Sequence, residues 1–179
     1  ECPPPDTPSR AHAAGTHSGP LRSNIAPMRT IIELASRTRE ELLDITVRRI
    51  VEASGVRDGI CCVYAHGATA AIMIQEHWDA SVPTDVVDLL RKLIPPGVWL
   101  HYRQDGNGDA HLKTGLVGPS ETMPVIDGTL GLSTWQGVFF CEFDGPRGDR
   151  RVSVTVLVDR CAVAIARFFA PFVAPPRRP

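Results

Sequence analysis

The densest group of chemically versatile side chains in this sequence lies in residues 101–113. The stretch contains two imidazoles, two carboxylates, two cationic groups and side-chain amides, with two glycines among them. Glycines let backbone N–H groups come close to a ligand, and several exposed N–H groups together can bind an anion. We therefore expect a polar site for a small anionic ligand along residues 105–111.

His66 is a second candidate, because it follows an apolar run, residues 60–65, that we predict to be a buried strand. A lone histidine at a strand end most often hydrogen-bonds to the backbone. Imidazoles from separate segments are, however, the usual way to hold Zn²⁺ or a similar ion. A divalent metal, Zn²⁺ or Mg²⁺, is thus one interpretation of the clustering, although the sequence has no HxH or HExxH spacing.

A third polar stretch runs from residue 133 to residue 147. Trp135 is by default a core residue, and Gln136 and Glu142 would be unremarkable on a strand that faced solvent. Basic residues gather just beyond, at Arg147, Arg150 and Arg151. The simpler interpretation is a solvated turn, and a binding patch is the alternative.

The composition limits the function classes that can apply. A chain of 179 residues is long enough for one domain with a real core. Its 19 basic and 20 acidic residues give a net charge of −1, which provides no general attraction to nucleic acid or to an anionic membrane. No stretch reaches the roughly 18 apolar residues of a spanning helix. Five cysteines, an odd number without a CxxC pair, favour a reducing, cytoplasmic compartment.

The two ends differ from the middle. Residues 1–27 are rich in Pro, Ala, Ser, Gly and His, so they cannot bury enough apolar surface to order themselves. We expect a disordered leader or a mis-called start, with the domain beginning at Met28. The domain is predicted over residues 28–158, and residues 159–179 are predicted to be a C-terminal appendage.

The elements between the ends predict an α+β fold. Strands are expected at residues 28–36 and 60–65, with residues 68–74 as the partner of the latter. One helix is predicted from apolar residues spaced along 43–54, starting at a capping box of Thr38 and Glu41 or, alternatively, at Asp44. A second helix is predicted from Val82, Val86, Leu89, Leu90 and Leu93. Residues 95–97, Pro-Pro-Gly, end it.

The last third of the domain is predicted to be β-structure. Residues 122–126 and 129–132 flank Asp127-Gly128, a strong hairpin signal. Residues 138–143 and 151–158 flank a loop rich in Gly, Pro and Asp. Val152, Val154 and Val156 alternate with polar residues, so one face of that strand should lie on the core. We expect an antiparallel-rich sheet with two main helices.

Many spaced motifs together resemble the YjbQ family, whose members are often called secondary thiamine-phosphate synthases. They are Asp44-Ile45-Thr46, Ser54-Gly55-Val56, His66-x-x-Thr69-Ala70-Ala71, Glu76, Asp105-Gly106-Asn107-Gly108-Asp109-Ala110-His111, Gly118-Pro119-Ser120, Asp127-Gly128, Thr134-Trp135-Gln136 and Glu142-Phe143-Asp144-Gly145-Pro146-Arg147. The resemblance covers nearly all of residues 28–158. It implies a small α+β domain assembled as a homotrimer.

The resemblance also implies an activity and a set of site residues. The reaction is weak thiamine-phosphate synthesis, in which a thiazole phosphate displaces diphosphate from hydroxymethylpyrimidine diphosphate. The catalytic residues would be His66, Asn107, His111 and Glu142. The residues that bind the phosphate or diphosphate ligand would be Thr69, Arg103, Asp109, Lys113, Trp135, Gln136 and Arg147. The metal ligands would be His66 and His111.

The sequence departs from the family pattern at one candidate ligand. A histidine often found just before the Asp-Gly-Asn stretch is Gln104 here, so His101 would have to replace it in a metal site. Two other functions stay open: a non-catalytic trimer that binds a metal or a metabolite, and a metal-dependent phosphoester hydrolase that uses a metal-bound water.

Overall fold

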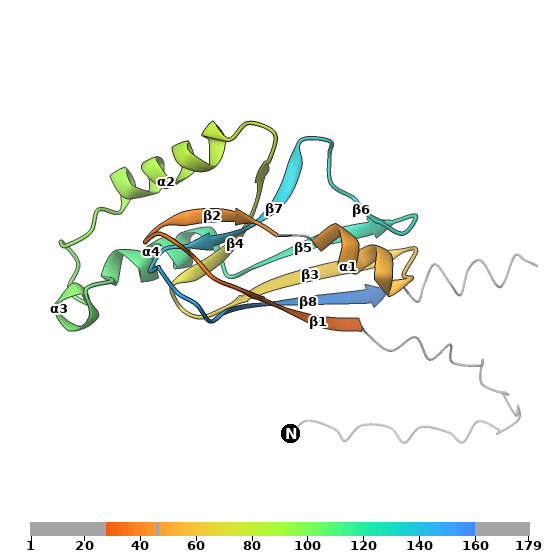
Figure 1. The fold of residues 1–179 in the computed structure, drawn as a ribbon, viewed down its shortest axis with the longest axis horizontal. Coiled ribbons are helices and arrows are strands. Elements are labelled where there is room, and N and C mark those ends of the chain that lie inside the picture. The colour runs from red at the N-terminus through yellow and green to blue at the C-terminus, as the bar shows by residue number, and fades with distance from the viewer. Residues whose placement is uncertain (1–27, 46, 160–179) are drawn as a thin grey trace, which may run out of the picture.

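The computed structural model describes residues 28–45 and 47–159, in which the chain forms two antiparallel β-sheets with helices packed beside them (Figure 1). The strands are β1 (Met28–Leu34), β2 (Glu41–Asp44), β3 (Gly59–His66), β4 (Ala70–Glu76), β5 (Ser120–Ile126), β6 (Thr129–Leu130), β7 (Gln136–Glu142) and β8 (Arg150–Val158). The helices are α1 (Val47–Ser54), α2 (Ser81–Leu93), α3 (Tyr102–Asp105) and α4 (Gly108–Val117). The predicted α+β class is confirmed. Residues 1–27, and the predicted appendage beyond Asp159, lie outside the described residues.

The larger sheet has the strand order β1-β8-β3-β5-β6. Val152, Val154 and Val156 of β8 are buried, and the residues between them are more exposed. Cys61 and Val63 of β3 are also buried and pair with Val156 and Val154. Because strand side chains alternate between the two faces, one face of this sheet forms the core, as predicted from the valine alternation.

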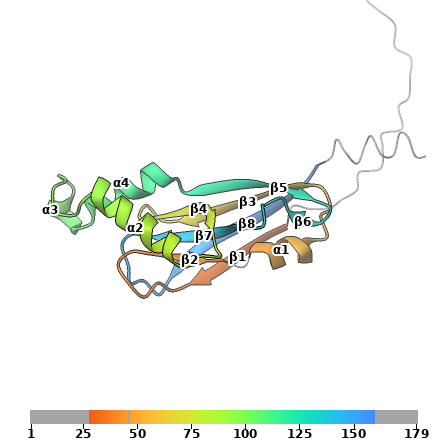
Figure 2. The ribbon, with the colours of Figure 1, turned by 90° about the horizontal axis from the view of Figure 1, so that it is seen from above.

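The smaller sheet has the order β2-β7-β4, and its central strand β7 is buried from Gly137 to Glu142. Phe140 packs in the cluster shared with the larger sheet, whereas Cys141 packs with Leu90 of α2 and Ala110 of α4. The view from above shows these helices beside the smaller sheet (Figure 2). A strand covered on both faces has a continuous apolar sequence, which is the pattern of residues 138–141 before the buried Glu142.

Helix α4 was not predicted, since the sequence indicated a polar site along residues 105–111 and no helix. Gly106 ends α3 at a φ of 70°, and α4 begins two residues later. The buried residues of α4 include Asp109, Lys113 and Thr114. A helix that buries polar side chains shows no apolar period, so its sequence gave no helical signal.

The predicted face of α2 is partly wrong. Val87 and Leu90 are its buried residues, whereas Leu89 and Leu93 are more than half exposed. Pro83 lies in the first turn, where a missing N–H is tolerated. The face toward the smaller sheet is therefore narrower and rotated relative to the one expected.

Residues 41–44 form a strand rather than the start of a helix. The Glu41 carboxylate does accept the Thr38 N–H, at 3.2 Å, as in a capping box. Glu41 to Asp44 then pair with β7, and α1 begins only at Val47. Of the two predicted starts, the one near Asp44 is the better, because tertiary pairing overrides the local capping signal.

β3 and β4 are not partners, contrary to the prediction. β3 lies between β8 and β5, and β4 pairs with β7 in the other sheet. The connection after His66 thus crosses between the sheets, with Gly67 at a φ of 117°. The predicted hairpin at residues 127–128 is confirmed, with both residues at positive φ and Ile126 paired with Thr129.

The described cysteines are free thiols. Burial raises the pKa of Cys61 to about 11, with the neighbouring Cys62 adding to the shift, and raises the pKa of Cys141 to about 12. Both thiols therefore behave as small core residues rather than as nucleophiles. Within the described ranges, no helix has the length and apolar character needed to cross a membrane.

Candidate functional site

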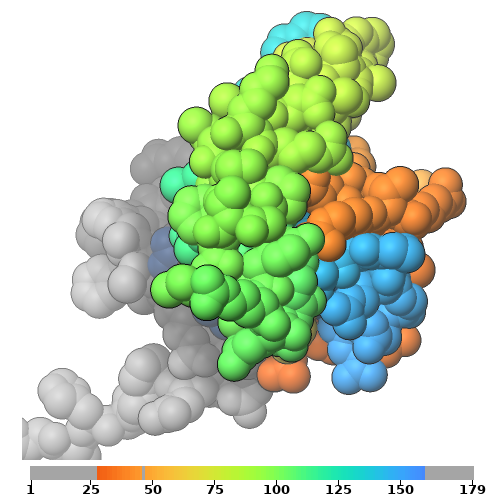
Figure 3. Space-filling view, turned by 90° about the vertical axis from the view of Figure 1, so that its left-hand side faces the viewer, coloured from red at the N-terminus to blue at the C-terminus, as the bar shows by residue number. Residues whose placement is uncertain are grey.

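The segment between β1 and β2 lies against the loop between β7 and β8, at the end of the molecule that carries α2, α3 and α4 (Figure 3). The Ser36 N–H donates to the Arg147 carbonyl at 2.8 Å, and the Gly145 N–H donates to the Arg39 carbonyl at 2.9 Å. A side chain at residue 145 would place its Cβ 2.2 Å from the Thr38 carbonyl oxygen. Glycine at this position allows the two segments to touch, and this contact brings their polar side chains together.

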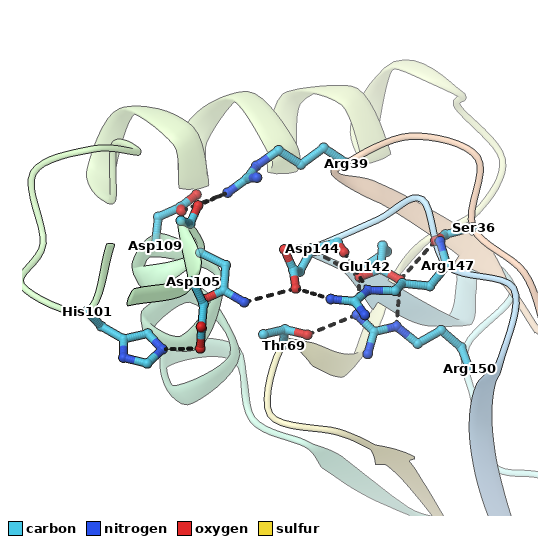
Figure 4. A network of polar contacts seen from close by, with 12 residues as sticks. Ser36, Arg39, Thr69, His101, Asp105, Asp109, Glu142, Asp144, Arg147 and Arg150 are labelled. Carbon is cyan, nitrogen blue, oxygen red and sulfur yellow. Dashed lines mark hydrogen bonds and ion pairs between the residues drawn. The ribbon is translucent and has the colours of Figure 1, made fainter. Parts of the chain in front are cut away.

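The Glu142 carboxylate is at the centre of this contact and is fully buried (Figure 4). Arg150 donates from Nε to Oε2 at 2.7 Å and from Nη2 to Oε1. Ser36 Oγ donates to Oε2 at 2.9 Å, and the Asp144 N–H donates to Oε1 at 2.9 Å. With this many donors, the Glu142 carboxylate is fully paired and holds Arg150, Ser36 and the loop between β7 and β8 together.

Arg150 links Glu142 to the β3–β4 connection. Its Nη2 also donates to Thr69 Oγ1 at 2.9 Å. A Cβ at Gly67 would lie 3.1 Å from Arg150 Nη1, so the connection follows the guanidinium closely. The predicted ligand-binding residue Thr69 is buried and acts through Arg150.

Asp144 connects the loop to α4 and to Arg147. Asn107 Nδ2 donates to its carboxylate at 3.0 Å, and Arg147 Nη2 donates at 2.6 Å. Partial burial acts to raise the pKa of Asp144, but these hydrogen bonds and the charges of Arg147 and Arg39 outweigh it and hold the pKa below its ordinary value. Asp144 therefore stays ionised and orients Arg147.

The oxygen of the Asn107 side-chain amide, unlike its nitrogen, accepts no hydrogen bond among the described residues. Asn107 is buried, and its Oδ1 has no hydrogen-bond partner within the part of the chain that the structure describes. Buried polar atoms are nearly always paired, so an orphaned acceptor here is a place where a ligand or a water can donate. This observation supports the predicted place of Asn107 in the site.

Lys113 and Asp109 belong to a buried ion network rather than to a ligand-binding surface. Lys113 Nζ is paired with Glu40 and, at 2.8 Å, with Asp109 Oδ2. Arg39 reaches the other Asp109 oxygen at 3.0 Å, and Arg91 pairs with Glu40. Lys113 and Asp109 are both fully buried, so their predicted contact with a diphosphate is replaced by a role in fixing α4 against the segment before β2.

A polar pocket of about 390 Å³ lies beside this network. We call it the arginine pocket; its lining residues are His66, Gly67, Arg147, Asp149, Arg150 and Arg151. Its lining includes three arginines, one histidine and one aspartate. Each arginine also has a carboxylate partner: Asp144 for Arg147, Glu142 for Arg150 and, at 3.5 Å, Glu33 for Arg151. The basic cluster thus lines a cavity, which is the arrangement that the anion-binding interpretation requires.

The predicted metal ligands do not form a metal site within the described chain. His66 Nε2 lies 2.7 Å from Ser153 Oγ, and its ring contacts Tyr64 on the same face of the larger sheet. The His111 ring instead contacts His101, with ring centroids 4.8 Å apart. No group of three or more His, Cys, Asp or Glu side chains in the described ranges could hold a metal ion.

Five other predicted residues are not among those that line the arginine pocket. His101, Arg103 and Gln104 are exposed on or beside α3, where His101 Nε2 lies 3.5 Å from Asp105. Gln136 begins β7 and Glu142 ends it, which places them about 20 Å apart at roughly 3.4 Å per residue. Trp135, beside Gln136, is half exposed and contacts Trp78. One chain therefore does not bring Trp135 and Gln136 to the arginine pocket.

Sequence reasoning missed the residues that hold the site in place. Ser36, Arg39 and Glu40 come from a segment predicted as strand end and helix start, and Arg91 comes from the polar side of α2. Nothing in their spacing marks them, because they meet across long sequence separations. Arg150 was noted only as part of the basic cluster, and its alternation with the buried valines of β8 could have shown that it faces inward.

Known proteins match this chain over most of the described residues. The family described as UPF0047 protein YjbQ-like matches residues 30–159. A UPF0047 protein of Methanocaldococcus jannaschii is 43% identical over 130 residues, which cover 72% of this chain and 93% of the relative. The UPF0047 protein YugU of Bacillus subtilis is 36% identical over 118 residues, covering 65% and 89%.

Solved structures of similar chains show the same fold. The crystal structure of a YbjQ-like protein of unknown function from Sulfolobus solfataricus has a TM-score of 0.73 and 34% identity, covering 75% of this chain and 99% of the other. An uncharacterized conserved protein of the YjbQ/UPF0047 family from Clostridium acetobutylicum has a TM-score of 0.67 and 39% identity, covering 72% and 99%. The resemblance drawn from the spaced motifs is thus confirmed, and this chain belongs to the YjbQ/UPF0047 family.

Proposed function

We propose that this chain binds a small phosphate or diphosphate ligand in the arginine pocket and is a weak thiamine-phosphate synthase. The observation that carries the proposal is the pocket itself, whose lining residues include Arg147, Arg150, Arg151 and His66. Guanidinium groups match phosphate oxygens in geometry as well as in charge. Gly67 also lines the pocket, and because it has no side chain a ligand can come close to its backbone.

Displacement of diphosphate is compatible with a site in which the carboxylates of Asp144 and Glu142 are already paired with arginines. The lone pair of the thiazole nitrogen forms the new C–N bond as the C–O bond to diphosphate breaks, and the diphosphate leaves with that electron pair. The nucleophilic nitrogen carries no proton to be removed, so the step needs no general base. It needs cations at the departing oxygens, and fixed guanidinium groups supply that stabilisation. The transferase reaction therefore fits a site in which Glu142 orients Arg150.

Non-catalytic binding of a phosphorylated metabolite is the second candidate. It is favoured because, of the four predicted catalytic residues, only His66 is among the residues that line the arginine pocket. The metal-dependent hydrolase is less favoured, because the described residues gather no set of three metal ligands and the imidazoles of His66 and His111 have other neighbours. A Zn²⁺ or Mg²⁺ ion has no place in the proposed step.

We further propose a cytoplasmic homotrimer without a nucleic-acid or membrane partner. The free thiols of Cys61 and Cys62, adjacent in sequence, fit a reducing compartment. Several large apolar side chains, among them Trp78 and Leu100, are strongly exposed and suit contacts between subunits. A neighbouring chain could bring its Trp135 to the arginine pocket, which a single chain cannot do.

Binding and turnover test the proposal separately. Calorimetric titration of the full chain with diphosphate should show binding, and the double variant Arg147→Gln, Arg151→Gln should weaken it at least about tenfold, since each removes a charged contact. Arg57→Gln, which alters an exposed arginine paired with Asp127, is the matched control and should bind like the parent. Unchanged binding in the double variant would refute the site.

Formation of thiamine phosphate from the two substrates is then measured for the parent and for His66→Ala. If the parent forms thiamine phosphate and His66→Ala loses both this turnover and affinity for diphosphate, the result supports the synthase proposal. Diphosphate binding without turnover identifies the chain as a binding protein.

A further inference from the structure

A second cavity lies near the other end of β7, away from the arginine pocket. Its volume is about 300 Å³, within the range of small-molecule sites. Its apolar wall is formed by Ile45, Val47, Leu130, Leu132 and Val138. Three polar residues, Asp44, Arg48 and His77, complete the lining, so we call it the Asp44–Arg48 cavity.

Asp44 and Arg48 have opposite charges but do not pair with each other. No ion pair within 4 Å involves either of them among the described residues. Arg48 Nη2 instead donates to the Gln136 carbonyl at 3.1 Å, which holds the guanidinium against the start of β7. The cavity thus offers one carboxylate and one cation at separate points above an apolar surface.

The walls are fixed by backbone contacts between distant segments. The Ile45 N–H donates to the Val138 carbonyl at 3.0 Å, and the His77 N–H donates to the Trp135 carbonyl at 3.0 Å. A Cβ at Gly137 would lie 2.8 Å from His77 Cβ, so His77 is closely packed against β7. The two charged groups are therefore presented by a frame that is formed without a ligand.

We propose that the Asp44–Arg48 cavity binds a small zwitterion with an apolar side chain, of the class of aliphatic α-amino acids. The ammonium group of such a ligand would pair with Asp44 and its carboxylate with Arg48, while the side chain covers the apolar wall. Asp44 and Arg48 are both exposed, so a ligand with one charge would lose one charge-assisted contact without leaving a buried charge unpaired. This site is independent of the phosphate ligand proposed above.

Titration calorimetry with three matched probes tests the ligand class. L-Leucine carries both charges, isopentylamine lacks the carboxylate, and isocaproate lacks the ammonium group. Leucine should bind the full chain at least about tenfold more tightly than either analogue. Equal affinity for leucine and for one analogue would overturn the zwitterion assignment, and no binding of leucine at millimolar concentration would overturn the site.

Two variants and a control test the location. Asp44→Asn and Arg48→Gln should each weaken leucine binding at least about tenfold, because each leaves one ligand charge unpaired. Arg49→Gln changes an exposed neighbour on α1 outside the cavity and should leave leucine affinity unchanged. All three variants should retain diphosphate affinity and the parent melting temperature. Leucine binding that survives both cavity variants would refute the assignment.

Discussion

Arg150 and Glu142 form a buried, two-pronged ion pair that joins the first residue of β8 to the last residue of β7. The strands belong to different sheets, so this pair ties the two sheets together beside the arginine pocket. The Glu142 side chain is fully buried and that of Arg150 is 10% exposed. The net contribution of such a buried pair to the stability of the fold is small, but removing one partner is costly because it leaves the other charge buried and unpaired.

Replacing Arg150 with methionine should therefore destabilise the fold strongly. Arg150→Met leaves the Glu142 carboxylate buried without its main cation, and we expect a loss of about 3–5 kcal/mol in the free energy of unfolding. Urea unfolding at one fixed protein concentration measures this loss. Arg151→Met removes an exposed arginine 3.5 Å from Glu33 and should cost less than about 1 kcal/mol. Equal losses in the two variants would contradict the role assigned to Arg150.

Gly145 should not tolerate a side chain. In Gly145→Ala the new Cβ would meet the Thr38 carbonyl oxygen at 2.2 Å and Ser36 Oγ at 2.7 Å, so backbone must move. Overpacking of this kind costs about 1–3 kcal/mol. The matched control is Gly148→Ala in the same loop, where an added Cβ meets nothing within 4 Å. A Gly145→Ala chain as stable as Gly148→Ala would show that the two segments are not in tight contact.

Acid should remove the stabilisation that Asp144 provides. The folded pKa of Asp144 is held below its ordinary value, near 3.9 in unfolded chains. Its contribution is therefore fully present above that value and is lost as the pH falls through the lower folded pKa. Unfolding free energies of the parent and Asp144→Asn should differ by a constant amount from neutral pH down to about pH 5, and should converge in more acidic solution. A difference that stays constant in acid would contradict the lowered pKa.

Gln104→His should create metal affinity that the parent lacks or strengthen affinity that it has. The substitution adds an imidazole beside His101, which already contacts His111 and lies 3.5 Å from Asp105. Elemental analysis after exposure to Zn²⁺ and removal of excess metal measures the bound ion per chain. Arg103→His adds the same ring one position earlier and serves as the control. Negligible metal in both the parent and the Gln104→His chain would contradict a metal site at this position.

The chain should form a homotrimer in solution. A domain of this size buries only about two-thirds of the surface of its unfolded chain, and exposed apolar residues such as Leu100 and Trp78 need cover. Light scattering coupled to size exclusion at micromolar concentration should give the mass of three chains. Trp135→Glu should lower that mass if the residue lies in the contact. A stable, well-folded monomer of the parent chain would refute the assembly.

Local pattern in the sequence was sufficient for much of the fold. The alternation of Val152, Val154 and Val156 with polar residues predicted β8 and its buried face. Asp127-Gly128 predicted the hairpin between β5 and β6, because few residues adopt the positive φ that this turn requires. The spacing of Val47, Ile50 and Val51 predicted α1, whose buried residues are Val47 and Val51. Such signals are local, since period and turn chemistry depend on residues a few positions apart.

The sequence by itself also determined the family, through motifs that span most of the domain. Tertiary structure alone decided which of the motif residues line the arginine pocket and which are buried in ion pairs. The sequence predicts that Lys113 binds the ligand and that Glu142 is catalytic. Both are instead ion-paired, Lys113 with Glu40 and Asp109 and Glu142 with Arg150, across separations of up to 73 residues. Partners at that distance leave no periodic trace, because only the packing of α4 and the two sheets brings them together.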